Sequence, residues 1–362
     1  MNKIGIILTL CTLCVYTSCS IKAGTELLQA TEHEIQLSPS ISIEAKPVSK
    51  VSRYESLLSN NSGDFSVTAF HATEGFAYFD NFDQVRYFST QQVWAFFDPY
   101  MGTNGDYYRR YWPTYPLDFL AFMPHYNSAT DDIAKDGSET TITLSNTGVS
   151  LNKMARTIQC ALPLSYNEQV SAKEFIYAYT KAQSYTEANK GKVNLNFIHP
   201  FSAVRFVLGA AHGNTLINSI ELRNLAFKGT LKASENVSQD ELSHEDWDLD
   251  NNNNKGTITI PVGKTVGAAG DNGIQLNTNI GVDLIVLPQE MTDDITIYVT
   301  YKWNETDYTS EVKVNTKQST PWSPGKIYTY KLNLGDSAED IISTVSITAW
   351  TDNGYKNDIN VE

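Results

Sequence analysis

Residues 295–303 read ITIYVTYKW and residues 327–335 read IYTYKLNLG. In both stretches β-branched and aromatic side chains recur at every second position, which is typical of a strand with two different faces. Further segments after residue 192 have the same character and are separated by Gly, Asn, Asp or Pro: 193–198, 203–209, 219–227, 257–262, 282–288 and 310–314. Short strands at this spacing predict an all-β sandwich.

The first half of the chain also contains mainly strand patterns. Residues 65–72 and 140–144 read as strands, and residues 115–124, YPLDFLAFMP, are apolar enough for a strand buried on both faces. Residues 172–182, AKEFIYAYTKA, are the best helical candidate. The polar stretch SYTEANKGK, residues 184–192, then predicts a linker and a domain boundary near Lys192.

Length and charge limit the class of protein. The 362 residues suit two domains of ordinary size. With 41 acidic and 27 basic residues, the formal net charge is -14. This charge argues against nucleic acid as a partner and against electrostatic docking on an anionic membrane surface.

The N-terminus has the pattern of a secretory signal. Lys3 is followed by an apolar run to Val15, which is too short for a permanent span of about 20 residues. The run contains Cys11 and Cys14, and Cys19 follows it. A metal site or a disulfide needs further ligands or a second cysteine pair at set spacings, and neither follows.

Residues 16–20, YTSCS, resemble a bacterial lipobox. In that motif the cysteine, here Cys19, receives diacylglycerol, and the signal, here residues 1–18, is removed. Cys160 would then be the only thiol of the exported chain, so no disulfide is expected. Tyr16 occupies a position that is usually aliphatic, so an ordinary signal peptide cleaved nearby is the alternative.

The first expected strand begins at residue 35. Apolar side chains occupy odd positions and polar ones occupy even positions, which predicts a half-buried strand; the apolar set includes Ile35, Leu37, Ile41 and Ile43. Pro39 has no N–H, which restricts such a strand to a sheet edge or interrupts it. A polar basic connector, KPVSKVSR at residues 46–53, follows.

The C-terminal segment offers a second alternation. Val345 and Ile347 alternate with Thr and Ser, and after a turn at residues 352–354 Ile359 and Val361 share one face. A terminal segment that follows a turn is free to leave its own domain. The alternative is that it closes the last sandwich as an edge hairpin.

No catalytic motif stands out, so we expect a protein that is not an enzyme and has no cofactor or metal. There is no Gly-x-Ser-x-Gly, no His-Glu-x-x-His and no phosphate-binding loop. The acidic stretch at residues 246–254, DWDLDNNNN, begins like a calcium loop, but Asn251 stands where an EF-hand needs Gly. A solvated acidic loop is the simpler interpretation.

One aromatic stretch, YYRRYWPTY at residues 107–115, has two interpretations. Its aromatic side chains could form a surface that stacks on a sugar or a protein partner; the residues concerned are Tyr107, Tyr108, Tyr111 and Trp112. Alternatively, they belong to the core and form cation–π pairs with the two arginines.

Read in order, several of these segments resemble the fimbrillin family of type V pilus subunits, the Mfa-like and FimA-like pilins of Gram-negative anaerobes. The resemblance covers most of the exported chain. It rests on the lipobox, the first strand with its basic loop, YPLDFLAFMP, FIHPFSAVRFVL (197–208), TPWSPGKIYTYKLNL (320–334) and ITAWTDNG (347–354). Departures are Tyr16 and polar insertions near residues 125–140 and 234–256.

The resemblance implies a fold and a domain order. The fold is two tandem transthyretin-like β-sandwiches. Here a signal at residues 1–18 and a lipidated segment at 19–53 would precede sandwiches at 54–192 and 193–362.

The resemblance also implies a structural or tip subunit of a cell-surface pilus that contributes to adhesion. The lipidated precursor reaches the outer membrane, and a trypsin-like protease cuts after the first strand, here at Arg53 or Lys50. A strand from another subunit, for which residues 343–362 are the donor candidate, fills the exposed groove and builds a homo- or heteropolymer. The basic residues of the connector could instead be ordinary solvated side chains.

The alternative function is a monomeric outer-membrane lipoprotein that never polymerises. It would bind glycan or host protein through loops such as residues 107–115. Proteolysis of the precursor followed by sizing separates the two hypotheses.

Overall fold

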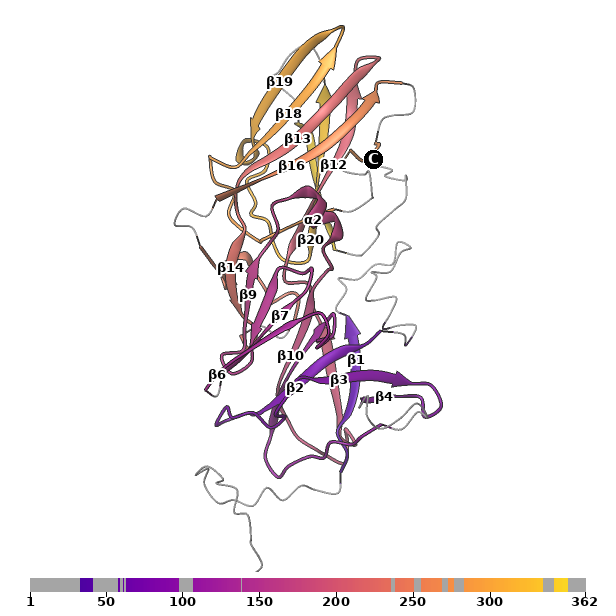
Figure 1. The fold of residues 1–362 in the computed structure, drawn as a ribbon, viewed down its shortest axis with the longest axis vertical. Coiled ribbons are helices and arrows are strands. Elements are labelled where there is room, and N and C mark those ends of the chain that lie inside the picture. The colour runs from indigo at the N-terminus through magenta and orange to yellow at the C-terminus, as the bar shows by residue number, and fades with distance from the viewer. Residues whose placement is uncertain are drawn as a thin grey trace, which may run out of the picture.

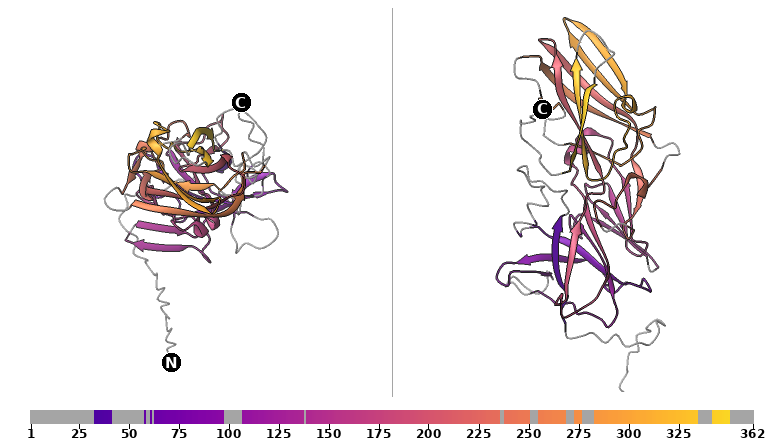
Figure 2. Two further views of the ribbon diagram at one scale, coloured as in Figure 1. Left: turned by 90° about the horizontal axis from the view of Figure 1, so that it is seen from above. Right: turned by 180° about the vertical axis from the view of Figure 1, so that it is seen from behind.

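The computed structural model describes residues 33–41, 58, 61, 63–97, 107–137, 139–235, 238–250, 255–268, 273–276, 283–334 and 342–350. These residues fold almost entirely as β-strands, so the all-β prediction is confirmed. The molecule is elongated, and its sheets follow one another along the long axis (Figures 1 and 2).

A seven-stranded sheet occupies the end of the molecule that lies lowest in Figure 1. Its strands, in spatial order, are β10 (Ile176–Gln183), β5 (Leu117–Met123), β2 (Phe65–His71), β3 (Asp83–Phe88), β4 (Val93–Phe96), β1 (Gln36–Ile41) and β11 (Lys192–Phe197). Tyr177 and Ile198 exchange two backbone hydrogen bonds of 3.2 and 2.8 Å beside the two edge strands. The sheet therefore curls until its edges meet.

A six-stranded sheet occupies the middle of the molecule. In spatial order it contains β15 (Trp247–Leu249), β14 (Lys228–Lys232), β9 (Thr157–Ala161), β8 (Val149–Asn152), β7 (Glu139–Leu144) and β6 (Asp132–Asp136). Strand β14 pairs with β9, so segments from both sides of residue 192 share this sheet. Because β11 belongs to the seven-stranded sheet, the sheets do not divide at the boundary expected near Lys192.

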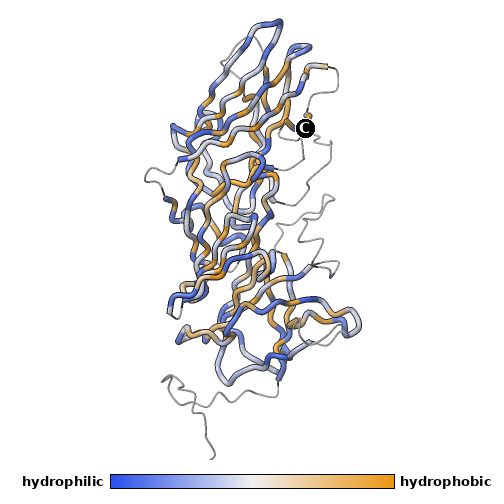
Figure 3. The backbone as a smooth tube through the Cα atoms, viewed as in Figure 1, coloured by the Kyte–Doolittle hydropathy of each residue, from blue (hydrophilic) through white to orange (hydrophobic). Residues whose placement is uncertain are grey.

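Two four-stranded sheets form a sandwich at the other end. One contains β17 (Leu284–Val286), β12 (Ser202–Ala211), β20 (Lys326–Leu334) and β21 (Ile342–Ala349). The other contains β16 (Lys255–Val266), β13 (Thr215–Ala226), β18 (Thr296–Trp303) and β19 (Thr306–Lys313). Both contribute to one core, for example through Phe206 and Ile260. The alternation of apolar and polar residues along these strands is visible in Figure 3.

The helix expected at residues 172–182 is wrong. Residues 176–183 form strand β10, and a short helix, α2 (Tyr166–Ser171), precedes it. Phe175, Tyr177 and Tyr179 pack into one core while Ile176 and Ala178 pack into the next. A segment that is buried on both faces has no polar side, so its period is hidden, and its aromatic side chains favour a strand.

The described residues also include two single 3-10 turns, η1 (His244–Asp246) and η2 (Val314–Thr316). Asp246 belongs to the stretch that begins like a calcium loop. Its carboxylate accepts from the backbone N–H and the hydroxyl of Ser243 at 2.6 and 3.0 Å. It therefore caps a helical turn.

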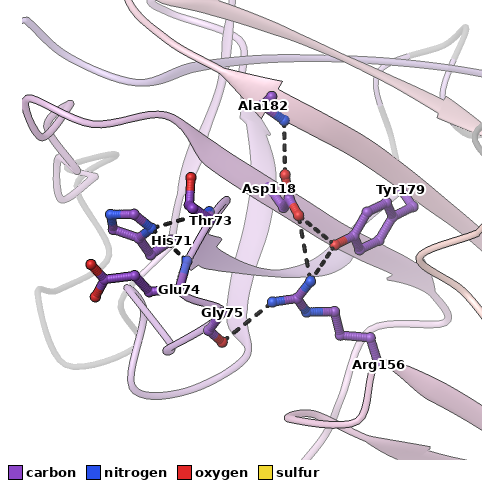
Figure 4. A network of polar contacts seen from close by, with 8 residues as sticks. All are labelled: His71, Thr73, Glu74, Gly75, Asp118, Arg156, Tyr179 and Ala182. Carbon is purple, nitrogen blue, oxygen red and sulfur yellow. Dashed lines mark hydrogen bonds and ion pairs between the residues drawn. The ribbon is translucent and has the colours of Figure 1, made fainter.

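A buried polar network joins the seven-stranded sheet to the six-stranded one (Figure 4). The Arg156 guanidinium, between β8 and β9, donates to the Tyr179 hydroxyl at 3.1 Å and lies 3.5 Å from the Asp118 carboxylate. Tyr179 also donates to Asp118 at 2.8 Å, and Arg156 donates to the Gly75 carbonyl at 3.3 Å. Two strands, β10 and β5, and the turn at Gly75 thus meet at a single cation.

Candidate assembly site

The first strand, β1, is an interior strand of the seven-stranded sheet. It pairs in parallel with β11 over six residues, from Gln36 opposite Lys192 to Ile41 opposite Phe197. Its other neighbour is β4, and that pairing is limited to Leu37 opposite Trp94. Among the described residues, β1 therefore has a continuous ladder on its β11 side and a single register pair on its β4 side.

The position of Pro39 follows from this asymmetry. The N–H of Gln36 points toward β11, because it donates to the Gly191 carbonyl at 2.9 Å, and the N–H of Ile35 points the other way, toward Arg110. Since N–H direction alternates along a strand, Pro39 faces the β4 side. Its missing N–H removes no hydrogen bond from the ladder with β11, so the strand tolerates a proline without lying at the edge.

The apolar face of β1 is buried as expected. Ile35 and Leu37 belong to the core of the seven-stranded sheet, and Ile41 packs against its margin. Val193, Leu195 and Phe197 of β11 line the same core. The sequence predicted β11 as a strand but contained no signal that it pairs with β1, because that pairing joins segments more than 150 residues apart.

The start of β1 is held by the aromatic stretch. The Trp112 N–H donates to the His33 carbonyl at 2.9 Å, and the Arg109 guanidinium lies 3.4 Å from the Glu34 carboxylate. Gly191 has a positive φ of 79°, and a Cβ there would lie 2.5 Å from the Glu34 carbonyl oxygen. Only glycine therefore allows this close approach of the chain to β1.

The aromatic stretch is mainly structural. Trp112 is completely buried and donates from Nε1 to the Gly191 carbonyl at 3.3 Å, so its expected place on a binding surface is wrong. Tyr107 and Tyr108 are half-buried, with Arg109 and Arg110 within 6 Å of their respective ring centres. Tyr111 is exposed. Trp112 is buried while Tyr111 is exposed because the core has room for the bulky indole ring.

An ion pair fixes this stretch beside β3 and β4. Arg110 lies 2.8 Å from the buried carboxylate of Asp83 and also contacts the ring of Phe79. Burial raises the pKa of Asp83, and the nearby Arg110 guanidinium opposes this rise. The Tyr108 hydroxyl shares the same carboxylate, and its pKa is raised by burial and by Asp83. These contacts hold the aromatic stretch in place, and their geometry does not indicate a reactive group.

The donor candidate, β21, is an edge strand. Its one partner among the described strands is β20, antiparallel, from Lys326 opposite Ala349 to Leu332 opposite Ile342. Ile342 is buried, Val345 is half-buried, and Ile347 is 46 % exposed. After the strand, the Trp350 ring stacks on His199 with 5.4 Å between ring centres. Most of β21 therefore buries little of its own apolar surface.

The structure does not bring β1 and β21 together within one chain. They belong to different sheets at different levels of the long axis (Figures 1 and 2). Other expected site residues lie outside the described residues: Cys19, Ile43, Lys50, Arg53, Ile359 and Val361. Their roles stay predictions.

Two other classes of site concern the part of the chain that the structure describes. Nowhere in it do three His, Cys, Asp or Glu side chains gather closely enough to hold a metal ion. It also contains no helix with the length and apolarity needed to cross a membrane.

Comparison with known proteins identifies the family. A family model described as fimbrillin-like matches residues 59–350, which is most of the chain. The chain belongs to the fimbrillin-like family. The resemblance predicted from the sequence is thus confirmed.

Solved structures of low sequence identity are also similar to this fimbrillin-like chain. A fimbrial protein from Bacteroides vulgatus is 17% identical, with 88% of this chain and 100% of that chain covered and a TM-score of 0.47. The tip fimbrial protein Mfa3 from Porphyromonas gingivalis, with a C-terminal truncation, is 10% identical, with 80% and 94% covered and a TM-score of 0.35. No curated protein matched the chain.

Proposed function

We propose that this fimbrillin-like chain is a structural or tip subunit of a cell-surface pilus. It would assemble when its first strand, β1, is exchanged for a strand of another subunit. Family membership supports the pilus, and the position of β1 is the observation that carries the exchange. The strand lies between β11 and β4, and within the described part of the chain its long ladder is with β11.

Loss of β1 would leave an apolar slot. Ile35 and Leu37 are buried, and burial of each such side chain is worth about 1.5–3 kcal/mol. Without them, Val193 and Leu195 lose their cover, and the β11 edge keeps unpaired backbone groups. A strand from another chain can satisfy both by β-augmentation.

The C-terminal segment is our candidate for that strand. Val345 and Ile347 alternate with polar residues and are only partly covered, so residues 344–349 lose little side-chain burial by leaving β20. Its anchors are Ile342 at one end and Trp350 at the other. The same apolar side chains would gain burial in the slot that β1 vacates.

Export and processing belong to the same proposal. Cys19 would carry the lipid that holds the precursor at the outer membrane, and a trypsin-like protease would cut after Arg53 or Lys50. Metabolic labelling with an acyl analogue should mark the wild type and not the Cys19→Ser variant. Label that persists in the variant rules out Cys19 as the lipid site.

Limited proteolysis tests the proposal. Trypsin should cut the purified precursor first within residues 46–53, and the product should form ladders that the intact chain does not form. Replacing Lys46, Lys50 and Arg53 with Gln should prevent both the cut and the ladders. A matched triple variant at Lys255, Lys264 and Lys313, which lie in folded strands, should behave like the wild type.

Two results would contradict strand exchange. One is a first cut elsewhere in the chain, located by mass spectrometry. The other is a product that is cut within residues 46–53 and stays monomeric after β1 has dissociated. Either result favours the monomeric binding lipoprotein.

A further inference from the structure

A group of aromatic side chains lies on the surface of the seven-stranded sheet, at the end of β2. We call it the aromatic patch and define it as His71, Phe76, Tyr78 and Tyr115. The ring centres of His71 lie 4.8 Å from Phe76 and 4.3 Å from Tyr115. Phe76 and Tyr78 each pack nearly edge-on against Tyr115, at 6.0 and 6.1 Å. These rings hold one another in fixed orientations.

Phe76 is exposed although it has apolar neighbours. It is 38 % exposed, one of few large apolar side chains with that exposure in the described part of the chain. The backbone fixes its position, because the His71 N–H donates to the Phe76 carbonyl at 2.9 Å. A rigid ring is thus presented to solvent, where it stabilises the fold little and is available to stack on a ligand.

The polar groups of the patch are also oriented. Nδ1 of His71 accepts from the backbone N–H groups of Thr73 and Glu74 at 3.2 and 3.0 Å (Figure 4). The proton of the neutral imidazole therefore lies on Nε2, which becomes a hydrogen-bond donor. Within the described residues this donor has no partner.

Two oxygen groups complete the set. The Glu74 carboxylate, on the same turn as His71, is exposed and has no ion-pair partner among the described residues. The Tyr115 hydroxyl is covered and has no hydrogen-bond partner in the described part of the protein. A donor and an acceptor therefore accompany one exposed ring, and the covered Tyr115 hydroxyl is not accessible to solvent.

We propose that the aromatic patch binds an uncharged saccharide ring. A pyranose has an apolar C–H face that stacks on an aromatic ring and an edge of hydroxyls that both donate and accept. Phe76 would receive the face, and His71 and Glu74 would receive the hydroxyls. The free carboxylate of Glu74 and the net charge of -14 disfavour anionic sugars.

The patch is distinct from the strand-exchange site. The Tyr78 hydroxyl donates to the Tyr111 carbonyl at 2.7 Å, and Tyr111 forms a bridge with Glu34, just before β1. No patch residue belongs to β1 or contributes to its ladder with β11. Saccharide binding and polymerisation can therefore be tested separately on one protein.

Saturation-transfer NMR on the full exported chain tests the proposal. The probes are the methyl glycosides of glucose, galactose, mannose and N-acetylglucosamine, with N-acetylneuraminic acid as the anionic comparison. We expect transfer to the C–H protons of one face of at least one neutral glycoside. The signal should fall about fivefold in Phe76→Ala and in Phe76→Leu, which keeps an apolar side chain without a ring.

Matched controls separate stacking from a general loss of structure. Tyr308→Ala removes an aromatic side chain on β19, at the opposite end of the long axis, and should leave the signal unchanged (Figure 1). Circular dichroism should give the wild-type spectrum for both Phe76 variants, because Phe76 is exposed.

Three outcomes overturn the proposal. The first is no transfer to any neutral glycoside. The second is transfer that persists in both Phe76 variants, or that is stronger for N-acetylneuraminic acid than for the neutral probes. The third is a dimer, measured by light scattering, that both Phe76 variants abolish, since the patch is then a contact between copies of this chain.

Discussion

At the residue scale, the buried ammonium group of Lys153 should make the stability of the protein depend on pH. It lies beside β8, is almost completely buried and donates to the Phe79 carbonyl. Burial lowers the pKa of Lys153 to about 8, although Asp80 and Asp83 oppose the shift. The unfolded chain keeps the ordinary lysine value of about 10.4.

Proton linkage gives the direction in which stability changes with pH. Between these two pKa values the unfolded state binds more protons than the folded state, so the free energy of unfolding should rise with pH above about pH 8. The full gain is at most about 3 kcal/mol. Urea titrations should show this rise between about pH 8 and pH 9.5, below the ionisation of ordinary tyrosines.

Lys153→Met should remove this dependence, and Lys264→Met, at an exposed position of β16, should retain it. If wild type and Lys153→Met show the same slope, Lys153 is not the group responsible.

The network around Arg156 makes a second prediction at this scale. Arg156→Met leaves Asp118 buried without its cation, which should lower the free energy of unfolding by about 3 kcal/mol. Arg86→Met removes a more exposed pair with Asp64 and should cost less than about 1 kcal/mol. Chemical denaturation measures both. Equal losses would show that the network contributes no more than a surface pair.

The sequence indicates the chemical character of a stretch better than it indicates which of its side chains are buried. The stretch 107–115 was recognised as aromatic and basic, and cation–π pairs were one of its two interpretations. Composition could not place Trp112 inside and Tyr111 outside, because that depends on the course of the backbone past His33 and Gly191. Phe76 carries no periodic signal, because it lies just after the turn at residues 72–74 and outside the strands.

At the element scale, the exposure of β21 predicts that a substitution on this strand can stop assembly without changing the stability of the precursor. Ile347→Asp should change the free energy of unfolding of the precursor by less than about 0.5 kcal/mol, because the side chain is largely exposed. The same change should stop ladder formation, because the charge would enter the apolar slot.

Ile342→Ala is the matched variant on the same strand, and it should destabilise the precursor by about 2 kcal/mol or more because Ile342 is buried. Denaturation and gel sizing after proteolysis measure the two effects. Normal ladders from Ile347→Asp would exclude Ile347 from the donor strand.

Most elements were predictable where one face is polar. Alternation located β1, β11 and β16, and the apolar run located β5, which is buried at every position. The same rule failed for β10, because a strand between two cores has no polar face to mark its period. The parallel pairing of β1 with β11 is a tertiary contact that no local pattern contains.

At the scale of the whole molecule, the sheets overlap the expected domain boundary. The core between the seven-stranded and six-stranded sheets includes Phe70 and Tyr177 from the first half and Phe201 and Trp247 from the second. A cut near residue 192 would therefore divide a shared core. The polar linker at residues 184–192 marks a turn between β10 and β11, and the sequence could not distinguish that turn from a boundary.

If β1 must leave before subunits join, a reversible covalent lock between β1 and β11 should block assembly. Ser40 of β1 and Asn196 of β11 are register partners whose side chains are hydrogen-bonded at 2.6 Å. Cysteines at both positions should form a disulfide in the folded precursor. A chain that begins at residue 20 otherwise contains only Cys160, which is buried.

The measurement is gel sizing of the Ser40→Cys, Asn196→Cys variant after trypsin has cut between β1 and β2, with and without reductant. Each single cysteine variant serves as a control and should form ladders in both conditions. Strand exchange predicts that the oxidised double variant stays monomeric and that reductant restores the ladders. Ladders from the oxidised, cleaved double variant would contradict it, because subunits would then join while β1 is still in place.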